Sequence, residues 1–486
     1  MRLSELFREV EFDGSIKNDA DINLVTDDSR LVRPGSLFVC IRHRSFNGHT
    51  AAVDALASGA AAVVTQDRLG LENELRVADS RSAYARLCAA LCNHPERKLR
   101  LIGVTGTNGK TTVTTLIRNI LSDSGTKTLL TGTVCNRLGD ENLPSGLTTP
   151  KPPELYSLLS RAVSQRCKAC VMEASSQALA QGRLEGIGFD AAVFTNITRD
   201  HLDYHGTFEN YISAKKKLFE HSALSIVNLD DPRANEIIAA SKGKIITFST
   251  VLDCADYTAK NISLLSDCVR FELVSKGHIE HIEFASPGLF SVSNAMAAAV
   301  CAINLGIEPK DAAQSLAKSK SVCGRLERVE CSAPYSVIID YAHTPDGLEQ
   351  VLRALRPSCR GKLIVLFGCG GDRDRTKRPL MGAAACKYAD KIIVTSDNPR
   401  SEDPTKIIGD ILKGTDKKRR DLFVEPDRRK AIAFALKTAE PGDTVLLAGK
   451  GHEKYQLIGG EKLPLDEREI VRKILGLPHD TGRKKQ

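Results

Sequence analysis

A stretch of twelve residues, LIGVTGTNGKTT at 101–112, constrains the fold of this chain more than any other feature. The apolar run at 99–104 predicts a buried strand, and the helical spacing of apolar residues over 111–125 predicts a helix that ends at a glycine. Between them, Gly106 and Gly109 lack a Cβ and can turn backbone N–H groups around an anion. The helix N-terminus adds unpaired amides and the positive end of the helix dipole. This order of elements predicts a phosphate-binding loop.

The common form of such a loop, G-x-x-x-x-G-K-[ST], has a glycine where this chain has Val104. An ordinary glycine-rich turn is the alternative interpretation, but Gly-x-x-Gly-Lys-Thr-Thr between a strand and a helix favours phosphate. We expect Lys110 to reach the outer phosphates of ATP and the hydroxyl of Thr111 or Thr112 to bind magnesium. The residues expected to bind ATP are Gly106, Thr107, Asn108, Gly109, Lys110, Thr111 and Thr112.

The chain has 486 residues, which is too many for one hydrophobic core. Apolar strand-like runs alternate with helical stretches, which predicts an α/β fold with mostly parallel sheets and helices on both faces. We expect a small α/β N-terminal domain at 1–98, a central P-loop domain with a parallel mononucleotide-binding sheet at 99–322, and a C-terminal Rossmann-like domain at 323–486. Functional residues should lie in loops beyond the carboxyl ends of strands.

Composition narrows the class of protein. The 68 basic and 60 acidic residues give a formal net charge of +8, but no basic stripe interleaved with aromatic residues occurs, so we expect no nucleic-acid partner. No apolar run reaches the length of a membrane span, and the N-terminus lacks the apolar segment of a signal peptide. The fourteen cysteines are scattered, which indicates reduced thiols. We therefore expect a cytoplasmic protein without a membrane span.

Polar residues follow apolar runs in the central region. Glu173 ends one such run, where a carboxylate could hold magnesium; the alternative is a helix N-terminus capped by Ser175 or Ser176. Three successive lysines at 215–217 lie on a predicted helix, and because successive residues are about 100° apart, one of them can turn toward a site while the others are solvated. The loop at 194–206 contains a dense polar cluster, Asn196, Asp200, His201, Asp203 and His205.

Three loops in the C-terminal region have compositions that suit a charged ligand. The stretch GCGGDRDRTKRPLMG at 368–382 combines glycines with Arg373, Arg375, Lys377 and Arg378, which is typical of anion binding. The stretch TSDNPRSEDP at 395–404 could hold both an amine and a carboxylate, and AGKGHEKYQ at 448–456 adds Glu453. A site divided between distant regions indicates domain closure around substrates.

These motifs together resemble those of the Mur ligases, the ATP-dependent amide-forming enzymes of peptidoglycan precursor synthesis. The resemblance covers nearly the whole chain and rests on TGTNGKTT, DHLDYHG, DYAHTPDGL, GCGGDRDRTKRPLMG and AGKGHE, in this order. It is strongest to the members that add the third stem-peptide residue to UDP-N-acetylmuramoyl-L-alanyl-D-glutamate. The loop of that family has the form T-G-T-N-G-K-T, so Val104 is expected there.

The resemblance implies a reaction and a set of catalytic residues. ATP phosphorylates the D-glutamate side-chain carboxylate, an incoming amine attacks the acyl phosphate, and phosphate leaves to give an amide with ADP as co-product. Lys110, Glu173, His201 and Lys215 would be catalytic, with Lys215 carbamylated to N6-carboxylysine. The implied ligands of Mg²⁺ are Thr111, Glu173, His201 and the Lys215 carbamate.

The resemblance also implies which residues bind the two other substrates. The UDP-substrate set is Asp27, Ser29, Arg44, Ser45, Phe46, Thr148, Thr149, Ser176, Gln181 and Arg183. The amino-acid set is Arg373, Asp397, Asn398, Pro399, Arg400, Gly449 and Glu453. Leu147 and Gln177 depart from the residues that relatives commonly have, which affects the details of substrate contact.

The DNPR motif at 397–400 bears on which amino acid is added. Enzymes that use meso-diaminopimelate have the arginine, which can hold the distal carboxylate bidentately, whereas lysine-adding relatives replace it. Ligation of L-lysine is therefore one alternative. A folate polyglutamate ligase is a second, although its substrate would need neither the N-terminal DDSR segment nor Arg400. A P-loop GTPase or transport ATPase is a third, and it leaves DNPR and GKGHE without a role.

Overall fold

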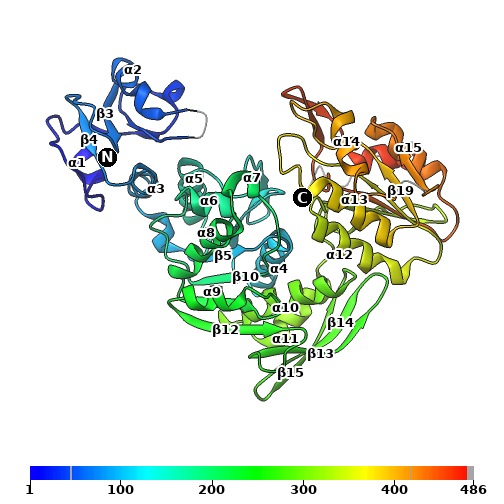
Figure 1. Cartoon of the computed structure of the whole chain (residues 1–486). Coiled ribbons are helices and arrows are strands. Elements are labelled where there is room, and N and C mark those ends of the chain that lie inside the picture. The colour runs from blue at the N-terminus through cyan, green and yellow to red at the C-terminus, as the bar shows by residue number, and fades with distance from the viewer. Residues whose placement is uncertain (44–45, 417–418, 479–486) are drawn as a thin grey trace.

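The computed structural model describes residues 1–43, 46–416 and 419–478. Within these residues the strands form sheets of four, eleven and six strands and a two-stranded ribbon. The three sheets follow one another along the chain, with the N-terminal region at one end of the molecule and the C-terminal region at the other (Figure 1). The predicted α/β fold class is confirmed.

The N-terminal sheet is parallel and has the order β1-β2-β3-β4. Its strands are β1 (Leu24–Thr26), β2 (Ser36–Val39), β3 (Ala60–Thr65) and β4 (Glu74–Arg76), with helices α1 (Leu3–Leu6), α2 (Ala52–Ala57) and α3 (Ser80–Leu91). Helix α3 packs against α5 (Pro152–Ser164) of the central region, and one buried apolar cluster spans both regions. The connection that follows α3 is a packed 3₁₀ helix, Pro95–Lys98, in which Pro95 and Glu96 are buried.

The central sheet has the order β15-β14-β13-β12-β11-β10-β5-β9-β6-β7-β8. Its parallel part consists of β5 (Arg100–Thr105), β6 (Thr128–Thr131), β9 (Ala169–Glu173), β10 (Ala191–Phe194), β11 (Leu224–Asn228) and β12 (Lys244–Ser249). The apolar side chains of these strands contact α4 (Lys110–Asp123), α10 (Leu289–Asn304) and α11 (Pro309–Lys318) on one face. On the other face they contact α5, α8 (Phe208–Glu220) and α9 (Ala234–Ala240).

Both edges of the central sheet are antiparallel, which the sequence analysis did not predict. One edge is β7 (Asn136–Leu138) with β8 (Glu141–Leu143). At the other edge β13 (Tyr257–Leu264) is parallel to β12, and β14 (Val269–Ser275) and β15 (His278–Phe284) continue the sheet as antiparallel strands. In β14 the buried Val269, Phe271 and Leu273 alternate with more exposed residues. This two-residue period is the sequence signal of a strand with one solvated face.

The C-terminal sheet has the order β16-β17-β21-β18-β19-β20 and is parallel except for β16. Its strands are β16 (Glu327–Arg328), β17 (Ser336–Asp340), β18 (Leu363–Phe367), β19 (Lys391–Val394), β20 (Leu422–Val424) and β21 (Thr444–Ala448). Helices α12 (Pro345–Leu355), α13 (Lys377–Tyr388) and α14 (Pro404–Leu412) cover one face, and α15 (Arg428–Lys437) and α16 (Glu467–Ile474) cover the other. The ribbon of β22 (Tyr455–Ile458) and β23 (Glu461–Pro464) follows β21.

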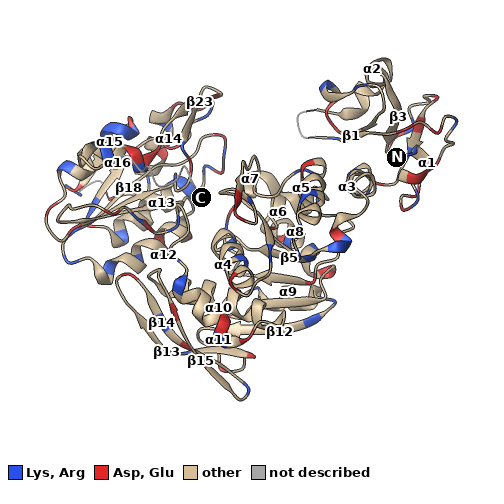
Figure 2. Cartoon of the chain, turned by 180° about the vertical axis from the view of Figure 1, so that it is seen from behind, with Lys and Arg blue, Asp and Glu red and all other residues tan. Residues whose placement is uncertain are grey.

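Basic and acidic residues are scattered over all three regions (Figure 2). No helix in the described part of the chain has the length and hydropathy of a membrane span. The positions that matter most for the site are the carboxyl ends of β5, β9, β10, β17, β18, β19 and β21, because the loops predicted to be functional follow these strands.

Candidate active site

A cavity of about 550 Å³ lies between the central and C-terminal regions. The central region contributes the phosphate loop, Glu173, Asp200, His201 and Lys215 to its lining. The C-terminal region contributes further residues, including Tyr341, His343 and Asp346. We call this space the central cavity. Among the described residues, none from the N-terminal sheet or its helices lines it.

The phosphate loop connects β5 to α4 at the wall of the central cavity. Gly106 has a φ of 154°, and a Cβ at this position would lie 1.9 Å from Thr195 Oγ1, so the loop could not follow its path with a larger residue. Lys110 Nζ donates hydrogen bonds to the carbonyl oxygens of Gly106 and Thr107, each at 2.8 Å. Burial lowers the pKa of Lys110.

Glu173 is the last residue of β9 and is 1% exposed. The backbone N–H of Thr133 donates to Glu173 Oε1 at 2.7 Å, and the Thr133 hydroxyl donates to Oε2 at 3.0 Å. Helix α6 (Ser176–Ala180) begins three residues later with Ser175 as its N-cap, which accepts a hydrogen bond from the Ala178 N–H. The carboxylate therefore points into the central cavity at a strand end and is not part of the helix cap.

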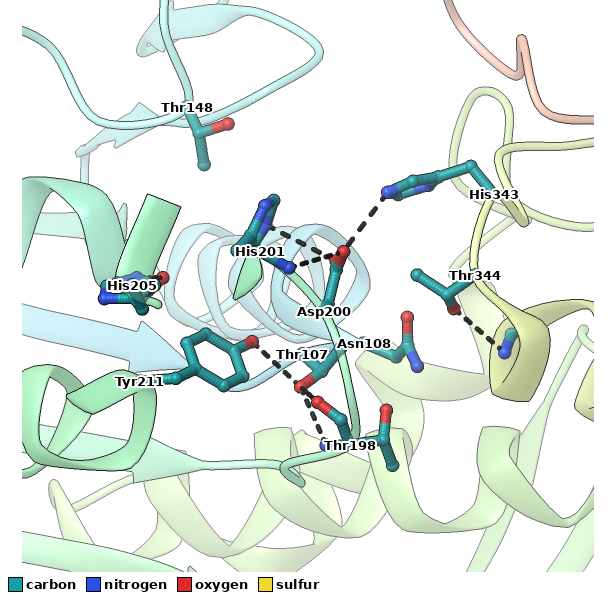
Figure 3. A network of polar contacts seen from close by, with 12 residues as sticks. Thr107, Asn108, Thr148, Thr198, Asp200, His201, His205, Tyr211, His343 and Thr344 are labelled. Carbon is teal, nitrogen blue, oxygen red and sulfur yellow. Dashed lines mark hydrogen bonds and ion pairs between the residues drawn. The ribbon is translucent and has the colours of Figure 1, made fainter. Parts of the chain in front are cut away.

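Asp200 lies between two histidines that come from different regions of the chain (Figure 3). Its Oδ2 is 3.4 Å from His201 Nε2 and 3.9 Å from Nε2 of His343, which follows β17. Burial lowers the pKa of His201 to about 4, although the Asp200 carboxylate opposes this shift. Burial alone would raise the pKa of Asp200, but His201, His343 and Lys377 bring it down to about 2. His201 is therefore a neutral imidazole at neutral pH.

Lys215 lies on α8 and is 1% exposed, whereas Lys216 is partly buried and Lys217 is exposed. Its Nζ donates to the carbonyl oxygen of Gly106 at 2.8 Å and lies 4.7 Å from the centre of the Tyr211 ring. Burial lowers the pKa of Lys215 well below its usual range, and the nearby Lys110 lowers it further. This environment favours the neutral amine, which is the nucleophilic form of lysine.

Most of the residues predicted to bind the UDP substrate in the central region meet at this cavity. Thr148, Thr149, Ser176 and Arg183 line it, as do Leu147 and Gln177. The Thr149 hydroxyl donates to the Glu173 carbonyl oxygen at 2.6 Å, and Arg183 Nη1 donates to the Thr149 carbonyl oxygen at 2.8 Å. Gln181 does not line the cavity but accepts hydrogen bonds from the Arg183 guanidinium through Oε1.

The residues predicted for the same substrate in the N-terminal region lie apart from the central cavity. Asp27 accepts hydrogen bonds from Lys151 Nζ, at 3.1 and 3.2 Å, and from the Tyr84 hydroxyl at 3.1 Å. Asp27 therefore joins the N-terminal region to the start of α5. Ser29 begins a 3₁₀ helix, Ser29–Leu31, and Phe46 is exposed. Arg44 and Ser45 lie outside the described residues.

The residues predicted to bind the amino acid gather beyond β18, β19 and β21. Arg400, with a left-handed φ of 52°, donates through Nη1 to the Gly371 carbonyl oxygen at 2.8 Å. Glu402, the nearest acidic residue in sequence, forms ion pairs with Arg375 and Arg378 and not with Arg400. Arg400 forms no ion pair with any carboxylate of the described residues, and its other hydrogen bond is to the Asn398 carbonyl oxygen. Burial lowers the pKa of Arg400 and the nearby Arg373 lowers it further. The remaining members of the set are Asp397, Asn398, Pro399 and Gly449, which are buried, and Glu453, which is partly buried.

The basic cluster at 373–378 is divided between two roles. Arg378 is 1% exposed and forms ion pairs with Glu402 and Asp410, so its charge stabilises the fold. Lys377 donates to the His343 carbonyl oxygen. Arg373 is exposed and lies near the predicted amino-acid loops. Arg378 and Lys377 are therefore occupied by contacts within the protein, and fewer cations of this stretch are free to bind an anion than its composition predicts.

Several residues of the site were not predicted from the sequence. Arg325 Nη2 donates to Thr111 Oγ1 at 3.1 Å, and its guanidinium lies 4.5 Å from the centre of the Tyr341 ring. Asn108 Nδ2 donates to Asp346 Oδ2 at 3.0 Å. These contacts join the phosphate loop to residues more than two hundred positions away. Local sequence patterns carry no signal for such pairs.

Comparison with known proteins identifies relatives of this chain. Residues 104–302 match the Mur ligase middle domain, and residues 324–451 match the Mur ligase glutamate ligase domain. The chain is 43% identical over 479 residues to UDP-N-acetylmuramoyl-L-alanyl-D-glutamate--2,6-diaminopimelate ligase of Caldanaerobacter subterraneus subsp. tengcongensis, and the alignment covers 98% of this chain and 99% of that protein.

Solved structures share the fold. A structure of a UDP-N-acetylmuramoyl-L-alanyl-D-glutamate--2,6-diaminopimelate ligase is 35% identical, with a TM-score of 0.70 over 98% of this chain and 99% of that one. Mycobacterium tuberculosis folylpolyglutamate synthase is 17% identical, with a TM-score of 0.65 over 80% of this chain and 94% of that one, and this likeness concerns the fold alone. On the full-length identity and the two matching domains, the chain belongs to the Mur ligase family.

Proposed function

We propose that this protein is an ATP-dependent, ADP-forming ligase that joins meso-2,6-diaminopimelate to UDP-N-acetylmuramoyl-L-alanyl-D-glutamate in cytoplasmic peptidoglycan precursor synthesis. The observation that carries this proposal is the central cavity, where the phosphate loop, Glu173, His201 and Lys215 meet the hydroxyls expected to bind the nucleotide substrate. The full-length relatives, whose names describe this ligation, support the same substrates.

The three regions have separate roles in this proposal. Residues 1–98 bind the UDP end of the substrate, 99–322 bind ATP and the acceptor carboxylate, and 323–486 bind the incoming amino acid. The contact between Asp27 and Lys151 supports a continuous path from the first region to the second. The contacts of Arg325 with Thr111 and of Asp346 with Asn108 support closure of the third region onto the phosphate loop.

A carboxylate becomes reactive toward an amine only when one of its oxygens is a good leaving group. Transfer of the ATP γ-phosphoryl group to the D-glutamate side chain supplies that leaving group and releases ADP. The amine then attacks the carbonyl carbon, and the tetrahedral intermediate expels phosphate and leaves an amide. Lys110 and Arg325, both at the phosphate loop, are placed to stabilise negative charge on the phosphoryl group as it moves.

Magnesium belongs to this proposal as the ion that accompanies ATP. Thr111, Glu173 and His201 line the central cavity and would hold it, together with Lys215 as a carbamate. Their chemistry fits, because His201 is neutral and the others offer oxygen. In the described part of the chain no three His, Cys, Asp or Glu side chains lie close enough to form a metal cluster. Magnesium bound with ATP needs no such cluster, because it takes one or two protein carboxylates and completes its coordination shell with phosphate oxygens and water. When bound, magnesium neutralises charge on the phosphates.

Carbamylation of Lys215 requires its neutral amine. The ammonium first loses one proton. The neutral nitrogen then attacks the carbon of CO₂, an N–C bond forms while one C–O π bond opens to a carboxylate oxygen, and the nitrogen releases a second proton, so that the cation becomes an anion. The depressed pKa of Lys215 supports this step, since a lower pKa increases the fraction of the unprotonated amine. The product also relieves the repulsion between Lys215 and Lys110.

Two alternatives are weaker. A lysine-adding enzyme has no use for a guanidinium at 400, whereas here Arg400 has no carboxylate partner among the described residues and is available to a ligand. A folate polyglutamate ligase shares the fold, but two structures of such an enzyme are only 17% and 18% identical to this chain.

Oxygen-18 in the acceptor carboxylate tests the proposed reaction. The protein would be incubated with ATP, meso-diaminopimelate and nucleotide dipeptide labelled in the D-glutamate side-chain carboxylate. We expect ADP formation to require all three substrates and one labelled oxygen to appear in the released phosphate. Unlabelled phosphate, or ADP release without the amino acid at the full rate, would overturn the proposal.

A further inference from the structure

Lys450 is a fully buried lysine that the proposed function has not used. It lies directly after Gly449, beyond the carboxyl end of β21, and is 0% exposed. Gly449 has a φ of 111°, and a Cβ there would lie 2.6 Å from Asp397 Oδ2, so this backbone can approach the β19 loop only as glycine. The loop after β21 is therefore built to bring Lys450 against the loop after β19.

The ammonium of Lys450 contacts residues from both loops. Its Nζ donates to Glu453 Oε2 at 2.5 Å and to Asn398 Oδ1 at 2.8 Å, and it lies 3.9 Å from Asp397 Oδ1. A buried ammonium is costly unless it is paired and hydrogen-bonded, and here it has a carboxylate, an amide oxygen and a second carboxylate nearby. The same three residues belong to the set expected to bind the amino acid.

These contacts fix the orientation of Asn398 and Glu453. Asn398 Oδ1 accepts hydrogen bonds from Lys450 Nζ and from the Leu457 N–H, so its amide nitrogen must face the other way, where it donates to Glu453 Oε2 at 2.9 Å. Both contacts of Glu453 are made through Oε2. Among the described residues none is made through Oε1, which leaves that oxygen for a ligand ammonium.

Lys450 also balances the charge of the site. Lys450, Arg400 and Arg373 contribute three positive charges, and Asp397, Glu453 and Asp372 contribute three negative charges. The distal end of a diamino acid such as diaminopimelate carries one ammonium and one carboxylate and is likewise neutral. Without Lys450 the site would carry an excess negative charge beside the place where that distal carboxylate must bind.

We propose that Lys450 is a positioning residue of the amino-acid site. Lys450 holds Asn398 and Glu453 in their binding orientation and makes the site neutral overall, so that the site suits the zwitterionic distal end of a diamino acid. This inference rests on the proposed function. Lys450 acts through its neighbours and does not itself contact the reacting atoms.

Lys450→Met is the first test, with Lys454→Met as the matched control. Lys454 lies in the same loop, but its side chain is 68% exposed and pairs with Asp466. We expect Lys450→Met to raise the apparent KM for meso-diaminopimelate by at least about tenfold, as expected for loss of a hydrogen-bonded charge. The KM values for ATP and the nucleotide dipeptide should stay within about twofold of the parent, because those substrates bind elsewhere. An unchanged KM for the amino acid, or an equal rise for all three substrates, would overturn the inference.

A double-variant comparison separates positioning from a general loss of stability. If Lys450 acts through Glu453, the variant Lys450→Met/Glu453→Gln should have the same KM for the amino acid as Glu453→Gln alone, within about twofold. The double variant leaves no unpaired charge between these two residues, so it gives a result even where Lys450→Met fails to fold. A KM in the double variant that is the product of the two separate effects would contradict the inference.

The parent protein distinguishes the two levels of the account. A parent that ligates no diamino acid refutes the proposed function and the inference with it. If the parent ligates meso-diaminopimelate and Lys450→Met has the same KM values as the parent for all three substrates, the inference alone is refuted.

Discussion

The side-chain nitrogen of Lys215 lies 2.8 Å from the carbonyl oxygen of Gly106, so a buried lysine of α8 contacts the phosphate loop itself. Lys110 Nζ donates to the same carbonyl oxygen at 2.8 Å. Two amines therefore meet at one acceptor in a buried space, where both positive charges are disfavoured. Conversion of Lys215 to a carbamate would replace this repulsion with attraction to Lys110.

Replacement of Lys215 with alanine should abolish turnover, because neither the amine nor its carbamate is then present. Added formate or acetate should restore part of the activity by placing a carboxylate in the vacated space. Turnover is measured as formation of the ligated nucleotide. Lys216→Ala is the control and should retain at least about half of the parent rate, since Lys216 is only partly buried and does not line the central cavity. Full activity in Lys215→Ala, together with loss in Lys216→Ala, would show that the neighbouring lysine is the functional one.

The depressed pKa of His201 predicts a pH dependence of stability. Its pKa falls from 6.5 to about 4 in the folded protein, so the unfolded chain takes up this proton first as the pH is lowered. The free energy of unfolding should therefore fall as pH decreases between these two values. Asp200 acts at lower pH, because its pKa is lowered from 3.8 to about 2 and its stabilising effect is lost only in that interval.

Thermal unfolding without ATP or magnesium tests this dependence. As the pH falls from about 6.5 toward 4, the midpoint temperature of unfolding should decrease less in His201→Asn than in the parent. The decreases over this interval should differ by at least about 2 °C. His278→Asn replaces an exposed histidine and should follow the parent. Parallel slopes for the parent and His201→Asn would contradict the pKa assigned to His201.

Arg400→Ala should weaken binding of meso-diaminopimelate selectively. Loss of a buried bidentate contact leaves the ligand carboxylate unpaired, at a cost of roughly 2–5 kcal/mol, so the apparent KM should rise at least about tenfold. The KM values for ATP and the nucleotide dipeptide should be nearly unchanged. Arg375→Ala is the control, because Arg375 is an exposed arginine that pairs with Glu402. Equal use of diaminopimelate by Arg400→Ala and the parent would refute this role of the guanidinium.

The sequence predicted the fold class and the phosphate loop because both depend on local patterns. The strand at 100–105, the glycine-rich turn and the helix that begins at Lys110 lie within a few residues of their predicted bounds. The antiparallel pairing of β13 to β15 was not predicted, because the alternation of Val269, Phe271 and Leu273 is a short signal that does not say which strands pair.

The positions of the candidate site residues were predictable only where a local motif marks them, at a strand end or on a helix face. Glu173 is the last residue of β9 and Arg400 lies in the loop after β19, and local motifs mark both residues. The contacts of Arg325 with Thr111 and of His343 with Asp200 join separate regions, so no spacing along the chain could predict them. The role of Lys450 was not predictable, because a lysine between two glycines is usually exposed and only burial in the structure distinguishes this one.

A competition between two amino acids is the most direct measurement of the central claim. The parent protein would be incubated with ATP, UDP-N-acetylmuramoyl-L-alanyl-D-glutamate and equimolar meso-diaminopimelate and L-lysine, and the nucleotide product would be identified by mass. The account predicts a product that contains diaminopimelate, with one ADP formed for each amide. A product that contains mainly lysine, or ADP formation with no ligated nucleotide, would contradict it.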